Sequence, residues 1–235
     1  MEAFFHGTAI FFAFVIPAAA IMLTFRALVK IPDELFRKIL HFILLGAYIP
    51  LCFGFETWWM AAALTAGFAV VLYPILTLAS RIPGFTKFTT QRKEGEFISS
   101  MVLALATMAI SVSLCWGVFG DRYLVLACVY AWGVGDAFAA LIGKQFGKHK
   151  IKLPFADSRK SWEGSAAMFL SAVLSVLIVL LVRSGLGFGA CLLISLLAAT
   201  ATTYVELITK DGLDTITCPA VAMAVIIPLV KILGG

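Results

Sequence analysis

The sequence predicts an all-α, polytopic integral membrane protein with about eight transmembrane helices. Of its 235 residues, 62% are hydrophobic and only 13% are charged, and the mean hydropathy is +1.02. A soluble domain of this length cannot bury so much apolar surface, so the chain must lie in a bilayer. No run alternates between apolar and polar residues, which argues against a β-barrel.

The spans appear as apolar runs at 3–25, 39–55, 57–79, 97–119, 122–142, 164–182, 187–208 and 216–233. A bilayer core of about 30 Å needs roughly 20 helical residues, so the second and last runs are near the short limit. Prolines within the runs are tolerated where neighbouring helices satisfy the carbonyl groups that they free. A seven-span alternative would merge two runs between Leu51 and Trp59. No repeat or linker divides the chain, so we expect one transmembrane domain over 1–235.

Basic residues lie almost entirely on one side of this topology. The links 26–38, 80–96, 143–163 and 209–215 hold 15 of the 18 Lys and Arg residues. By the positive-inside rule, these links face the cytoplasm and both termini lie on the other side. This alternation independently supports eight spans. The five cysteines are scattered, with no Cys-x-x-Cys pair, and are expected to be buried free thiols.

Residues 135–165 combine an acid within an apolar run with a strongly basic end. Asp136, Ala140, Gly143 and Gly147 are spaced to lie on one face of a helix. An intramembrane carboxylate is costly, so it indicates function, and it suits a hard cation such as Mg²⁺. Small residues beside it would let a ligand approach the backbone. The pattern predicts a metal-bound polyphosphate; the simpler alternative is an acid paired with a lysine, beside glycines that only pack helices.

The start of the sixth run is a second candidate anion site. Ser161 could cap a helix whose first backbone N–H groups are free, Lys160 adds a full charge, and Glu163 follows in the first turn. The simpler alternative is ordinary capping, with an acid at the first turn.

Further polar residues fall in the same, cytoplasmic half. Arg37, Lys38 and His41 lie within one helical turn, and a neutral His41 could orient or deprotonate a lipid hydroxyl. Asp214, at the mouth of the last helix, is a second candidate for metal binding or base catalysis. Glu206 could bond only to neighbouring threonine hydroxyls. Convergence on one side is what an active site that draws a soluble nucleotide requires.

The central stretch resembles the signature of the CTP-dependent lipid-alcohol kinases, a group that includes dolichol, phytol and farnesol kinases and the CTP-type diacylglycerol kinase. The matching residues are Asp136, Ala139, Ala140, Gly143, Gly147, Lys160, Ser161, Glu163, Gly164 and Ser165. Weaker matches flank it at 37–41 and 212–219, where the family's Asp-Asn is Asp214-Thr215 here. The resemblance covers roughly 35 to 220. The chain has no Gly-x-x-x-x-Gly-Lys-Ser/Thr loop, so it is not a P-loop kinase.

The resemblance implies transfer of the γ-phosphoryl group of CTP to a polyprenol, dolichol, phytol-type prenol or diacylglycerol at the cytoplasmic face, with no nucleic acid involved. Asp136, with Glu163 or Asp214, would bind Mg²⁺, and the catalytic base is left open between His41, Asp136 and Asp214. The membrane would be the plasma membrane in a prokaryote, and the endoplasmic reticulum or a plastid membrane in a eukaryote. The implied nucleotide-binding residues are Arg37, Lys38, Gly143, Lys144, Gly147, Lys148, Lys160, Ser161 and Gly164.

Two alternatives remain open. Phosphatidate cytidylyltransferases have a similar acid-led helix followed by Lys-Thr-Trp-Glu-Gly, and Trp162 fits that pattern. Their downstream Gly-His-Gly-Gly block is absent from 209–219, which favours the kinase. A small transporter would also carry costly intramembrane acids. The acids here gather toward one face, however, and a basic cytoplasmic link has no evident transport role.

Overall fold

The computed structural model describes residues 1–81, 95–151, 160–209 and 212–234. These residues form eight helices long and apolar enough to cross a membrane, which confirms the predicted fold class. The helices are α1 (Glu2–Leu28), α2 (Asp33–Phe53), α3 (Trp58–Ala79), α5 (Glu96–Ser111), α6 (Arg122–Phe146), α7 (Trp162–Arg183), α8 (Phe188–Ile208) and α9 (Asp214–Ile232). A π-helical segment, Val112–Val118, extends α5 to complete its span.

Two of the helix starts have side-chain caps. The carboxylate of Asp121 accepts the backbone N–H groups of Tyr123 and Leu124 at the start of α6. The hydroxyl of Ser161 accepts the N–H of Gly164 at 3.2 Å, so the predicted cap of α7 is confirmed. Arg183, in the last turn of α7, forms an ion pair with Asp121. This pair ties the end of α7 to the start of α6.

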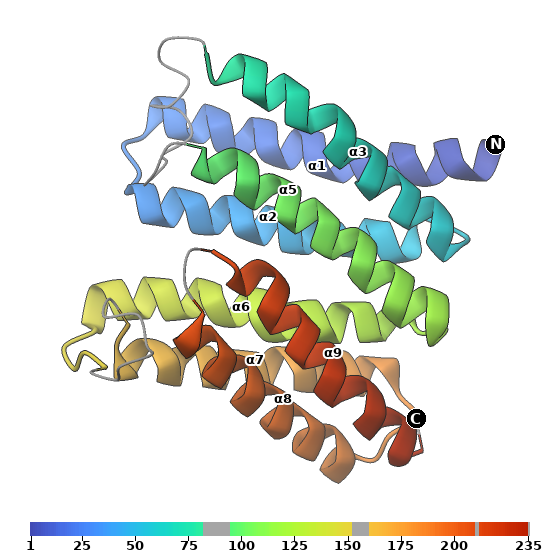
Figure 1. The fold of residues 1–235 in the computed structure, drawn as a ribbon, viewed down its shortest axis with the longest axis vertical. Coiled ribbons are helices and arrows are strands. Elements are labelled where there is room, and N and C mark those ends of the chain that lie inside the picture. Colours follow the sequence, from blue (N-terminus) through green and yellow to red (C-terminus); the bar gives the residue numbers. More distant parts are fainter. Residues whose placement is uncertain (82–94, 152–159, 210–211, 235) are drawn as a thin grey trace.

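The α6 helix lies between the two parts of the bundle and packs against α2, α7 and α9. Figure 1 shows α1, α2, α3 and α5 on one side of α6, α7 and α8 on the other, and α9 crossing α6 diagonally. Both termini lie at one end of the bundle, while α2, α7 and α9 begin and α6 ends at the opposite end. The placement of the termini on the non-cytoplasmic side stays a prediction.

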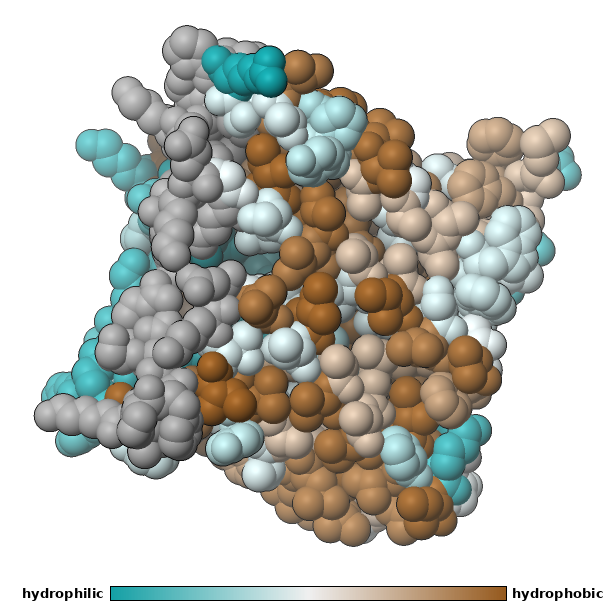
Figure 2. All heavy atoms as spheres, in the orientation of Figure 1, coloured by the Kyte–Doolittle hydropathy of each residue, from teal (hydrophilic) through white to brown (hydrophobic). Residues whose placement is uncertain are grey.

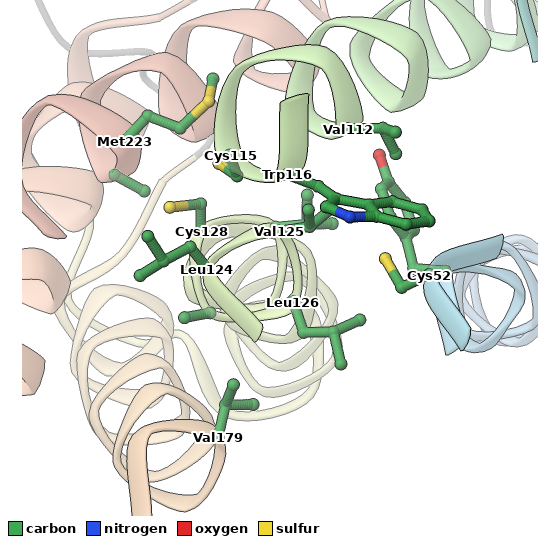
Figure 3. Close-up of a cluster of buried hydrophobic side chains, with 14 of the residues drawn as sticks. Cys52, Val112, Cys115, Trp116, Leu124, Val125, Leu126, Cys128, Val179 and Met223 are labelled. Carbon is green, nitrogen blue, oxygen red and sulfur yellow. The ribbon is translucent and has the colours of Figure 1, made fainter. Parts of the chain in front are cut away.

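The buried core lies toward the end that holds the termini. Figure 3 shows Cys52 of α2, Cys115 and Trp116 of the π-helical segment, and Leu124 and Cys128 of α6 packed together. All five cysteines are free and buried, as predicted. Figure 2 shows hydrophobic side chains over the middle of the visible face and hydrophilic ones along the left edge, where α2 begins and α6 ends. The core thus leaves that end of the bundle for polar residues.

Candidate active site

An ion pair between α2 and α6 lies at the centre of the polar end. The Nζ atom of Lys38 lies 2.6 Å from Oδ2 of Asp136. The two side chains are 10% and 19% exposed, respectively. Each charge offsets the cost of burying the other. The intramembrane acid therefore has the lysine partner that the simpler sequence interpretation anticipated, and its role as a metal ligand stays a prediction.

His41 lies on α2, one helical turn beyond Lys38, and it also contacts α6. Its Nε2 atom is 2.9 Å from the carbonyl oxygen of Gly133 and 3.9 Å from Oδ2 of Asp136. Because a carbonyl oxygen can only accept a hydrogen bond, we assign the proton to Nε2. In the neutral ring, Nδ1 then carries the free lone pair. In this tautomer only Nδ1 of His41 can accept a proton, and the role of His41 as a base stays a prediction.

Trp132, four residues before Asp136 on α6, was not singled out from the sequence. Its indole N–H donates to Oδ2 of Asp214, at the start of α9, over 3.3 Å. Its ring meets that of His41 edge-on, with 5.1 Å between centroids. The i, i+4 spacing from Asp136 could have indicated this residue, because it places both side chains on one face of α6. Trp132 therefore links His41 to Asp214, and His41 in turn lies 3.9 Å from Asp136.

Lys160 joins this cluster from the residue before the α7 cap. Its Nζ lies 2.8 Å from Oε1 of Glu206 and also donates to the backbone carbonyls of Glu206 and Thr209 at the end of α8. A cation is favoured there because the last carbonyl groups of a helix lack partners. Of the two possibilities left open for Glu206, bonding only to threonine hydroxyls is the one that the structure excludes. The Thr202 hydroxyl donates to backbone carbonyls, and Glu206 pairs with Lys160.

Glu163 has a different partner. Its Oε1 lies 2.6 Å from Nδ1 of His149, and its carboxylate accepts the backbone N–H of His149. Two backbone hydrogen bonds, Ile151 N–H to Lys160 O and Trp162 N–H to His149 O, lie beside this pair. Across the described ranges, no three His, Cys, Asp or Glu residues form a group that could hold a metal ion. Glu163, Asp136 and Asp214 therefore do not form an all-protein metal cage.

The glycines of the predicted ligand groove lie at the contact between α6 and α7. A Cβ atom at Gly143 would lie 3.3 Å from the Ser161 hydroxyl, and one at Gly164 would lie 3.2 Å from the Cα of Gly143. At Gly147, a Cβ would lie 2.5 Å from the same hydroxyl. The start of α7 therefore occupies the space expected to admit a ligand, because bare glycines let the two helices approach closely. Their contact with a nucleotide stays a prediction.

The other basic candidates lie at the edge of the cluster. Arg37 and Lys144 approach the same oxygen of Glu34, at 3.8 Å and 3.9 Å. Lys144 and Lys148 are exposed. Further charged residues of the links 143–163 and 209–215 lie outside the described residues, among them Lys152, Arg159, Lys210 and Asp211. Arg37 and Lys144 thus both lie close to the same carboxylate, that of Glu34, which was not singled out from the sequence.

The cluster has the donors that a metal-bound polyphosphate needs. The carboxylates of Asp136, Glu206 and Asp214 are within electrostatic range of one another and of Lys160. Mg²⁺ in nucleotide sites is commonly held by one or two carboxylates together with phosphate oxygens, so a cage of three protein ligands is not required. Asp136 and Asp214 fit that requirement, and Lys38 and Lys160 lie beside them, paired with Asp136 and Glu206 in this structure.

Comparison with known proteins finds relatives that are named as lipid-alcohol kinases. A phytol kinase of Synechocystis is 27% identical over 220 residues, 85% of this chain and 82% of its own length. A probable chloroplastic phytol kinase of wheat is 32% identical over 144 residues, 58% of this chain but 46% of the wheat protein. Mouse dolichol kinase is 28% identical over 164 residues, 63% of this chain and 30% of the mouse protein. No solved structure shows a significant match.

These relatives confirm the predicted resemblance to the lipid-alcohol kinases and indicate a kinase enzyme. The family match extends over the whole chain, residues 1–235. The chain belongs to the cytidylyltransferase family.

Proposed function

We propose that this chain is a CTP-dependent lipid kinase, with 1–235 as a single catalytic domain. It transfers the γ-phosphoryl group of CTP to the hydroxyl of a membrane lipid alcohol. The observation that carries the proposal is the cluster of Lys38, His41, Asp136, Lys160 and Asp214 at one end of the bundle. Phosphoryl transfer needs positioning and charge neutralisation more than covalent work by the protein, and this cluster offers both.

Lys38 and Lys160 are the proposed phosphate ligands nearest the cluster's centre. In this structure Lys38 is paired with Asp136 and Lys160 with Glu206. Phosphate oxygens would compete with these carboxylates for the ammonium groups, which frees carboxylate oxygens for a cation. Asp136 and Asp214 would hold Mg²⁺ together with the phosphates. When bound, the ion supplies charge neutralisation at the β- and γ-phosphates.

His41 is the proposed general base. Its Nδ1 has the free lone pair in the assigned tautomer, whereas Asp136 is already paired with Lys38. The proton of the acceptor hydroxyl passes to Nδ1 as the hydroxyl oxygen bonds to the γ-phosphorus. The bond from that phosphorus to the β–γ bridging oxygen breaks, and CDP leaves. The products are CDP and a lipid monophosphate.

An isoprenoid alcohol is the acceptor that the relatives favour, since those reported are named for phytol and dolichol. In this proposal the site faces the cytoplasm, as the positive-inside rule predicts for the basic links. The test is CDP release by the purified chain in lipid nanodiscs with CTP, Mg²⁺ and one alcohol at a time: phytol, farnesol, dolichol or diacylglycerol. CDP release that depends on a prenol supports the proposal; failure of every alcohol to stimulate release, and to yield a lipid monophosphate, contradicts it.

A second candidate is phosphatidate cytidylyltransferase activity, which Trp162 and the family match favour. Its test replaces the alcohol with phosphatidic acid. Pyrophosphate release and formation of CDP-diacylglycerol would support it.

A further inference from the structure

Trp132 connects two residues that come from helices far apart in the sequence. Its indole contacts the His41 ring of α2 on one side and donates its N–H to the Asp214 carboxylate of α9 on the other. The side chain is 4% exposed. An indole N–H can only donate, so this single hydrogen bond orients one particular oxygen, Oδ2 of Asp214.

The position of Trp132 on α6 relates these contacts to Asp136. The two residues are four apart, so their side chains follow one another along one helix face. That face carries the Asp136 carboxylate beside Lys38, and the Trp132 ring beside His41. A movement of the indole would therefore change the orientations of His41 and Asp214 relative to Asp136.

We infer that Trp132 is a positioning residue of the active site, which holds the Asp214 carboxylate and the His41 imidazole in fixed orientation around Asp136. This inference rests on the proposed function. A catalytic group stabilises the transition state only when its surroundings hold it in the correct position. Displacing such a group by a fraction of an ångström therefore lowers kcat more than it changes KM.

The alternative is that Trp132 only fills the core, and a matched control separates the two. Trp116, in the π-helical segment, is also buried, at 8% exposure, and its ring stacks under Arg122 rather than on a residue of the cluster. Trp132→Phe keeps an aromatic ring against His41 and removes the N–H donor. Trp116→Phe removes a comparable ring volume at the other end of the bundle.

The test measures CTP-dependent lipid phosphorylation by the full chain in nanodiscs. We expect Trp132→Phe to lower kcat roughly tenfold, the effect of one lost hydrogen bond to a charged group, with KM for CTP and for the alcohol unchanged. Trp116→Phe should keep the parent kcat. In an Asp214→Glu background, where the carboxylate is already displaced, Trp132→Phe should lower kcat by much less than tenfold, because coupled residues are not additive.

A second variant covers the case in which Trp132→Phe does not fold. Benzothienylalanine at 132 replaces the indole N–H with sulfur at nearly the same shape, and it should reproduce the loss of kcat. If either variant at 132 folds and keeps the parent kcat, the positioning role of Trp132 is wrong. The same holds if the effects of Trp132→Phe and Asp214→Glu are fully additive. Neither result bears on the proposed kinase function. A parent chain that releases no CDP with any alcohol overturns the proposed function, and this inference with it.

Discussion

The ammonium group of Lys38 lies 2.6 Å from a carboxylate oxygen of Asp136, although 98 residues separate them in the chain. This contact fixes the register of α2 against α6 at the polar end of the bundle. It also means that two residues proposed to act on a nucleotide and its cation are paired with each other. Binding of phosphate to Lys38 and of a cation to Asp136 would then be coupled events.

Replacing Asp136 with Asn should abolish phosphoryl transfer, because it removes the charge without changing the volume. The variant should also be less stable by about 3–5 kcal/mol, since Lys38 would be left buried without its counter-ion. The control is the double variant Lys38→Met with Asp136→Asn, which removes both charges. Thermal unfolding in detergent should show recovered stability in the double variant, still without transfer. Near-parent turnover of Asp136→Asn at saturating Mg²⁺ would exclude the metal role.

Replacing Lys160 with Ala should raise the KM for CTP, because a cation beside the phosphates is lost. It should also lower the unfolding temperature, because Glu206, 12% exposed, loses its partner. Adding Glu206→Gln should restore the unfolding temperature but leave the KM high. A double variant whose KM for CTP returns to the parent value would show that Lys160 is a structural clamp on α8 and not a phosphate ligand.

Replacing Gly164 with Ala should destabilise the protein by about 1–3 kcal/mol, because overpacking at a close helix contact forces the helices apart. The added Cβ would lie 3.0 Å from the carbonyl oxygen of Ala139 on α6. Gly189→Ala is the matched control: it also lies in the first turn of a helix, and nothing lies within 4 Å of its added Cβ. Equal unfolding temperatures for the two variants would contradict the packing role of Gly164.

The orientation of the chain can be measured by cysteine labelling, because every native cysteine is buried. Gln145, near the end of α6, and Gly187, just before α8, are both exposed and lie at opposite ends of the bundle. With both termini outside, a cysteine at 145 should react with an impermeant maleimide only from the cytoplasmic side, and one at 187 only from outside. The reverse pattern would invert the topology and put the cluster on the wrong side for cytosolic CTP.

The number of spans could be predicted from hydropathy because the bilayer imposes both length and apolar composition. The ends of the helices were harder to predict where polar residues lie inside a helix. The second run was expected to start at 39, whereas α2 begins at Asp33, since Arg37 and Lys38 lie within the helix. An average over a window counts such residues as outside the membrane. For Lys38 the reason lies in its ion pair with Asp136 on α6, which the position of Lys38 in the sequence does not reveal.

The site residues were predictable by type, and their pairing was not. The signature indicated Asp136, Lys160 and Glu163 as a set. In the structure they have separate partners, Lys38, Glu206 and His149. Those pairings depend on how α2 and α8 pack against α6 and α7, which sequence spacing does not encode. The glycines show the same limit, because their spacing suits a ligand groove and a helix contact equally.

The most direct test of the central claim is to determine which phosphorus atom of CTP is transferred to the lipid. CTP labelled at the γ-phosphorus, or separately at the α-phosphorus, is supplied to the chain in nanodiscs that contain prenols, diacylglycerol and phosphatidic acid. The account predicts that γ-label appears in a lipid monophosphate with release of CDP, and that α-label enters no lipid. Label from the α-position in lipid, with release of pyrophosphate, would contradict the kinase and establish the cytidylyltransferase.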